Sequence, residues 1–155
     1  MKLSSPVFNH GEAVPDRYTC AGANINPPLK FTDVSPACKS LTLIVEDPDA
    51  PGKPWIHWLV YNIPENAPGI DEHSVPSGAV DGIANGGTHG YEGPCPPSGT
   101  HHYHFTLYAL DTMLNLPETA DKQAVEEAMK GHVLDTAELI GISNLDGKKR
   151  VYPTK

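Results

Sequence analysis

The chain has 155 residues, a length that fits one domain with a sizeable core, and no shift in composition divides it into two. Its formal net charge of -8 disfavours a nucleic-acid-binding surface, because phosphate backbones are bound by clustered lysine and arginine. The 16 prolines and 14 glycines predict many fixed turns and favour a loop-rich β fold over a helix bundle.

The sequence also predicts where the protein is located. No stretch reaches the roughly 20 apolar residues that a transmembrane segment needs, and the N-terminus lacks the apolar part of a signal peptide. We therefore expect a cytoplasmic protein.

Cys20, Cys38 and Cys95 are widely spaced and match neither a disulfide framework nor a paired zinc motif, so we expect free thiols. We interpret the basic run Lys148-Lys149-Arg150 as a solvated tail.

The first two thirds of the chain predict a β fold. Residues 1–30 carry turn signals and read as loops and short strands that wrap the edge of a sheet. The run 41–46, LTLIVE, is apolar at nearly every position, which is typical of a strand buried on both faces, and 58–63 has the same character. In 103–109, alternation puts Tyr103, Phe105, Leu107 and Ala109 on one face of a third strand. We expect all three strands to be central.

Helical periodicity appears only late in the chain. A helix is predicted over 121–130, where Ala124, Val125, Ala128 and Met129 form one apolar stripe, with Asp121 as the expected N-cap and Gly131 as the stop. A second short helix is predicted from Val133 to Ile140, ended by Gly141. The fold class is therefore mostly β, with a few short peripheral helices near the C-terminus that cover one edge or face of the sheet.

Two segments join a loop rich in proline and glycine to an alternating, strand-like run. They are DPDAPGKPWIHWLVYNIP (47–64) and GYEGPCPPSGTHHYHFTLYALD (90–111). Such junctions commonly display functional groups at the end of a strand. We expect the two junctions to outline one binding pocket.

These segments resemble the phosphatidylethanolamine-binding protein family, also called Raf kinase inhibitor-like proteins, and specifically its short bacterial and archaeal branch. The resemblance rests on YTCAGANINPPL (18–29), DPDAP (47–51), GPCPPSGTHHY (93–103) and AMKGHVLDTAELIG (128–141). Several motifs in the right order are more specific than any one alone. The resemblance implies a single-domain antiparallel β-sandwich and a small pocket for phosphate or a phospholipid headgroup. It also implies a kinase or protease partner that the protein would inhibit, and a homodimer.

The resemblance also assigns the pocket residues position by position. Asp47 matches the family's pocket carboxylate, His57 and His101 match its two imidazoles, and Tyr103 matches an aromatic wall. Imidazoles held by a carboxylate become charge-assisted donors to an anion when they are protonated. The expected ligand is therefore a small anion.

The loop from Cys95 to Pro97 supplies the remaining expected contacts. The backbone N–H of Cys95 matches the donor that meets the anion, while Pro96 and Pro97 hold the loop in shape. Trp55 lies where the family places an aromatic residue at the pocket rim. Tight loops also make Pro51 and Pro97 candidates for cis peptide bonds.

Other interpretations of these residues stay open. Asp47 and Asp49 flank a proline and are typical turn formers, and His57 at the head of an apolar strand can be an ordinary core histidine. Cys95 beside a histidine is the candidate nucleophile of a small hydrolase. A zinc site is chemically permissible but lacks the short ligand spacing such sites show. We expect a binding protein without cofactor or metal, and assign no catalytic residue.

The sequence departs from the family pattern at two positions. The family's HRY triplet reads His101-His102-Tyr103 here, so a permanently charged arginine is replaced by a side chain that titrates near neutrality. Alternation points His102 away from its two neighbours, so we expect the change to alter the support around the site and to spare the anion contacts. Phe31 stands where the family commonly has tryptophan, which should affect packing.

Overall fold

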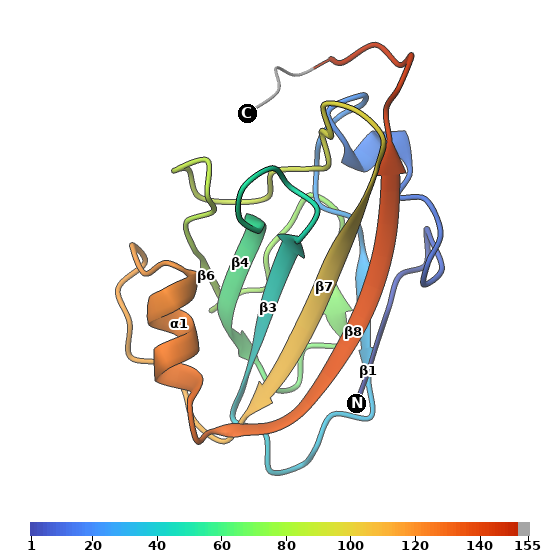
Figure 1. Ribbon diagram of the computed structural model, residues 1–155. Coiled ribbons are helices and arrows are strands. Elements are labelled where there is room, and N and C mark those ends of the chain that lie inside the picture. Colours follow the sequence, from blue (N-terminus) through green and yellow to red (C-terminus); the bar gives the residue numbers. More distant parts are fainter. Residues whose placement is uncertain (152–155) are drawn as a thin grey trace.

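The computed structural model describes residues 1–151 as two antiparallel sheets that pack face to face (Figure 1). The small sheet has the order β1-β2-β5 and consists of β1 (Lys2–Ser4), β2 (Leu29–Thr32) and β5 (Gly69–Ile70). The large sheet has the order β6-β4-β3-β7-β8 and consists of β3 (Ser40–Asp47), β4 (Trp55–Pro64), β6 (Val80–Asp81), β7 (Thr100–Leu110) and β8 (Val133–Asn144). The predicted mostly β, antiparallel sandwich is confirmed, and the three strands predicted as central each have a neighbour on both sides.

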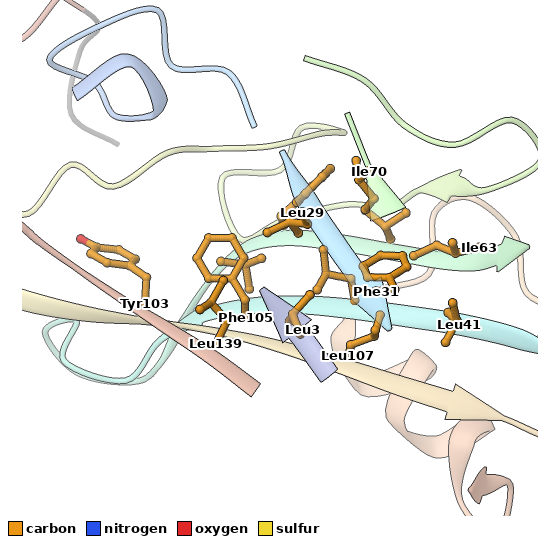
Figure 2. Close-up of a cluster of buried hydrophobic side chains, with 14 of the residues drawn as sticks. Leu3, Leu29, Phe31, Leu41, Ile63, Ile70, Tyr103, Phe105, Leu107 and Leu139 are labelled. Carbon is orange, nitrogen blue, oxygen red and sulfur yellow. The ribbon is translucent and has the colours of Figure 1, made fainter. Parts of the chain in front are cut away.

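The main hydrophobic core lies between the two sheets (Figure 2). Leu3 and Phe31 of the small sheet face it from one side, and Phe105 and Leu107 of β7 face it from the other. The predicted alternation of β7 is confirmed, since the side chains on this face are no more than 1% exposed. Burial of this one face explains why the strand keeps its register.

A second core lies on the other face of the large sheet, under α1 (Lys122–Met129). Val125 and Met129 of the helix pack there with Ile44 of β3 and Leu59 of β4. Because both faces are covered, β3 is buried at almost every position, which confirms the strand buried on both faces that its sequence indicated. The N-cap is also confirmed, since the Asp121 carboxylate accepts from the Ala124 N–H at 2.9 Å.

The predicted second C-terminal helix was wrong. Residues from Val133 onward form β8, which pairs antiparallel with β7 along its length. The buried positions of its second half alternate, with Leu139, Gly141 and Ser143 facing inward. The apolar spacing of 133–140 fits a helix locally, but pairing with β7 outweighs that weak preference.

The chain near the N-terminus covers part of the outer edge of β8, as predicted. Gly11 N–H donates to Ile140 O at 2.7 Å, and Val14 N–H donates to Ile142 O at 2.8 Å. Gly141 is required here because an added Cβ would lie 2.5 Å from Val14 Cγ2. The only other described helix is the short 3₁₀ turn η1 (Asp16–Tyr18), and within residues 1–151 no helix is long and apolar enough to cross a membrane.

Candidate functional site

The structure brings every predicted site residue to one cavity of about 350 Å³. Its lining includes residues from the end of the large sheet where β3 ends and β4 and β7 begin. The ribbon in Figure 1 shows these three strand ends side by side. Antiparallel pairing puts these three strand ends side by side, because Asp47 is in register with Trp55 and β3 also pairs with β7. We call this cavity the histidine pocket after His57 and His101. The predicted residues in its lining are Asp47, Trp55, His57, Cys95, Pro96, Pro97, His101 and Tyr103.

His101 is held by Asp47, a buried carboxylate at the end of β3. His101 Nδ1 donates to Asp47 Oδ2 at 2.7 Å, and the Asp49 N–H donates to Asp47 Oδ1 at 2.8 Å. An ionised carboxylate only accepts hydrogen bonds, so the proton of a neutral His101 ring resides on Nδ1. Nε2 is therefore the nitrogen of His101 that remains for a ligand.

His57 is held by the main chain of Glu92. His57 Nδ1 donates to Glu92 O at 2.5 Å, and Glu92 N–H donates back to His57 O at 2.8 Å. A carbonyl oxygen only accepts, so Nδ1 again carries the proton and Nε2 remains for a ligand. Burial lowers the pKa of His57 below its ordinary value, against the opposing effects of the Glu92 carbonyl and of the Asp47 charge.

Tyr103 forms an aromatic wall of the histidine pocket, as predicted. Its ring meets the ring of His57 nearly edge to face, with centroids 5.1 Å apart. Burial and the nearby Asp47 charge raise the pKa of Tyr103, so the phenol stays protonated near neutrality. The wall is therefore neutral and rigid.

The predicted free thiols of Cys20 and Cys95 were wrong, because the two residues form a disulfide with their Cα atoms 5.4 Å apart. The two cysteines are 75 residues apart in sequence, and their loops meet only in the folded chain. Cys38 is free and buried, as expected. While the disulfide is intact, Cys95 has no thiolate to act as a nucleophile or a zinc ligand.

Hydrogen bonds join the same two loops beside the disulfide. Cys20 N–H donates to Pro94 O at 3.1 Å, and Gly93 N–H donates to Asn24 Oδ1 at 3.0 Å. These contacts and the disulfide hold the Cys95 loop against the N-terminal segment. The peptide bonds of the described residues 1–151 are all trans, so neither candidate proline, Pro51 or Pro97, is cis.

The basic run near the C-terminus is only partly the solvated tail that we expected. Arg150 is half-buried, and its guanidinium donates to the carbonyl of Pro96 in the pocket loop. Val151 N–H donates to Cys20 O at 2.7 Å. Lys149 is exposed, and Lys148 pairs with Asp16 at 2.9 Å on the surface. Arg150 therefore stabilises the pocket loop through a hydrogen bond to its main chain.

His102 points away from the histidine pocket, as alternation predicted. Its Nδ1 lies 2.7 Å from Asp49 Oδ2, and its N–H donates to the same oxygen at 2.8 Å. These bonds lower the pKa of the Asp49 carboxyl. Asp49 is therefore a structural partner of His102 and, through its N–H, of Asp47.

Sequence reasoning missed six residues of the lining. They are Cys20, Asn24, Ala50, Pro51, Glu92 and Gly93. Cys20 and Asn24 belong to the motif YTCAGANINPPL, so that motif was the available signal for them. Glu92 holds His57 through its main chain, which no side-chain pattern reveals.

Known proteins are similar in sequence to this protein over most of its chain. A family model described as phosphatidylethanolamine-binding protein matches residues 4–144. The UPF0098 protein of Methanothermobacter thermautotrophicus is 51% identical over 147 residues, which cover 92% of this chain and 97% of that protein. A UPF0098 protein of Chlamydia pneumoniae is 46% identical over 146 residues, which cover 91% and 97%.

Two solved structures have the same architecture. A Chlamydia trachomatis protein, described as a phosphatidylethanolamine-binding protein homologue, is 43% identical with a TM-score of 0.89, covering 92% of this chain and 96% of that one. Escherichia coli YbcL, described as a member of the mammalian family, is 30% identical with a TM-score of 0.86, covering 92% and 97%. The chain belongs to the phosphatidylethanolamine-binding protein family.

Proposed function

We propose that this protein is a binding or regulatory protein whose histidine pocket takes a small anion, such as phosphate or the phosphate of a phospholipid headgroup. The observation that carries the proposal is the pair of imidazoles, His57 and His101, each fixed through Nδ1 and each left with Nε2 for a ligand. The family description adds support, because phosphate is the anionic part of phosphatidylethanolamine.

The charge state of the pocket adds a condition to this proposal. A neutral imidazole with its proton on Nδ1 presents a lone pair at Nε2, which repels an anion. Asp47 adds a buried negative charge close to His101. The anion must therefore bind together with a proton, which either resides on an imidazole or arrives on the ligand, as in hydrogen phosphate.

The rigidity of the pocket favours binding. Pro96 and Pro97 have fixed φ angles, and the disulfide ties their loop to the N-terminal segment. Little ordering entropy is then lost when a ligand enters. Trp55 and the exposed Pro97 both line the pocket.

The proposal extends to a partner and a location. A phosphorylated or carboxylate side chain of a kinase or protease would enter the same pocket, so that this protein, as a homodimer in the cytoplasm, would inhibit the partner. In the cytoplasm this disulfide would persist only where thiols are not kept reduced, as in hyperthermophiles, so the proposed location carries that condition. If the protein were instead a hydrolase, a histidine could still act as the general base. The thiol of Cys95, the candidate nucleophile, is however bonded to Cys20 in the disulfide.

Removing either pocket imidazole should weaken phosphate binding. We expect His57→Ala and His101→Ala each to lower the affinity at least about tenfold, since each loses a charge-assisted hydrogen bond. His102→Ala is the matched control on the opposite face of β7 and should bind like the wild type. The measurement is calorimetric titration with inorganic phosphate, after circular dichroism shows that each variant is folded. Wild-type affinity in both pocket variants would overturn the assignment.

Anion affinity should rise as the pH falls. Burial lowers the pKa of His57 below its ordinary value, so the ring is neutral at pH 7, and a bound anion stabilises the imidazolium. Binding thus takes up protons, and the affinity rises as the pH falls towards the lowered pKa of the ligand-free His57. Titration with sulfate, which does not itself titrate here, in two buffers of different ionisation enthalpy measures the uptake. A flat sulfate affinity between about pH 5 and 8, without proton uptake, would contradict this expectation.

A further inference from the structure

A second cleft, of about 780 Å³, lies on the other side of Asn24, which lines both cavities. Its walls come from the N-terminal loop, the loop at residues 73–75, and the side chains of Trp58, Asp81 and Tyr91. The family resemblance assigned no ligand to this cleft, which shares only Asn24 with the lining of the histidine pocket. We call it the Asp81 cleft.

Asp81 is a half-buried carboxylate in the wall of this cleft. Its Oδ1 accepts from Trp58 Nε1 at 3.1 Å, and burial raises the pKa of the carboxyl in spite of that bond. Among residues 1–151, no lysine, arginine or histidine nitrogen forms an ion pair with it. The charge is therefore poorly solvated and poorly compensated, which costs free energy unless a cation is supplied.

Two of the nearby cationic side chains are hydrogen-bonded to groups other than the Asp81 carboxylate. Arg17 also lines the cleft, but its guanidinium is bonded to the Glu72 carboxylate at 2.7 and 3.3 Å. His89 Nδ1 donates to the main-chain carbonyl of Asp81 at 2.8 Å, and only its more distant charge acts on the carboxylate. His73 is in the lining with an exposed side chain.

An apolar surface adjoins the carboxylate. The ring of Tyr91 packs edge to face against Trp58 with centroids 5.5 Å apart. The Tyr91 hydroxyl donates to Tyr18 O at 2.8 Å, which holds the ring in place. A carboxylate beside a fixed aromatic wall suits a cation on a short hydrocarbon stem.

We propose that the Asp81 cleft binds a small molecule with a primary ammonium group. The ammonium donates to the carboxylate of Asp81 and replaces the solvation that the fold removes, while the hydrocarbon stem lies along Tyr91. This site is separate from the histidine pocket and does not depend on the function proposed for it.

The two tryptophans allow each cavity to be observed separately. Trp58 Nε1–H donates to Asp81, whereas Trp55 lines the histidine pocket, so their indole N–H signals in ¹⁵N-edited NMR report on different sites. Titration with n-propylammonium chloride at low ionic strength should shift the Trp58 signal saturably and leave the Trp55 signal in place. 1-Propanol, of the same size but neutral, should leave both signals in place.

Asp81→Asn tests the charge alone, because an asparagine oxygen still accepts from Trp58 Nε1. We expect this variant to bind n-propylammonium at least about tenfold more weakly. Asp33→Asn, the same change at an exposed position that lines neither cavity, should bind like the wild type. The proposal is overturned by a Trp58 signal that does not saturate, by an equal shift with 1-propanol, or by wild-type affinity in Asp81→Asn. Phosphate titration read at Trp55 tests the histidine pocket independently.

Discussion

Replacing Cys20 and Cys95 together with serine should lower the free energy of unfolding by about 4 kcal/mol. The disulfide joins residues 75 positions apart and so closes a large loop in the unfolded chain, which lowers the conformational entropy of the unfolded state. Without the disulfide the unfolded state regains this entropy, and folding becomes less favourable. Urea denaturation of the wild type and the double variant measures the difference. This loss would be a large share of the 5 to 15 kcal/mol typical of a domain, as an order-of-magnitude comparison.

The wild type under reducing conditions provides the matched control. Its free energy of unfolding should fall to about that of the double variant, and the same reductant should leave the variant unchanged. A wild type that is insensitive to reductant would contradict the assignment of the disulfide. Phosphate affinity should change much less than stability, because the bonds from Cys20 to Pro94 and from Gly93 to Asn24 still join the loops in the folded state.

Replacing Asp47 with asparagine should raise phosphate affinity at neutral and mildly basic pH. The oxygen of the introduced amide keeps the bond from Asp49 N–H, so its NH₂ group faces His101 Nδ1. That nitrogen must then accept, the ring proton moves to Nε2, and His101 becomes a neutral donor to the anion. The buried carboxylate charge is also removed.

The expected size follows from the charge. An anion bonded to Nε2 lies roughly 6 to 7 Å from the carboxylate, and at an effective dielectric constant near 20 the repulsion is about 2.5 kcal/mol, or roughly 70-fold in affinity. Side-chain ¹⁵N NMR of His101 reports the tautomer, and phosphate titration reports the affinity.

Asp49→Asn is the control for this variant, since it alters the carboxylate that binds His102 and not His101. It should leave the His101 tautomer and the phosphate affinity near those of the wild type. An unchanged His101 tautomer in Asp47→Asn would contradict the reasoning about hydrogen-bond direction. A changed tautomer without any gain in affinity would count against anion binding in the histidine pocket.

Local patterns determined much of the fold. The alternation of residues 103–109 and the continuous apolar run at 41–46 are direct consequences of burial on one face or on two, so β7 and β3 could be read from the sequence. Asp121 and the apolar stripe after it likewise identified α1. Motifs at the strand ends identified the residues that the structure brings to one cavity, although their role in binding remains a prediction.

Only the tertiary structure decided the features that depend on distant partners. The spacing of 133–140 suits a helix, and pairing with β7 makes it a strand. The disulfide joins loops that the sequence keeps far apart, and Arg150 binds a pocket loop that no local pattern connects to it. The ring nitrogen that carries the proton in His57 and His101 is set by a carbonyl and a carboxylate from other strands and loops. Periodicity records which face of an element is buried, whereas these contacts depend on what the fold places against that face.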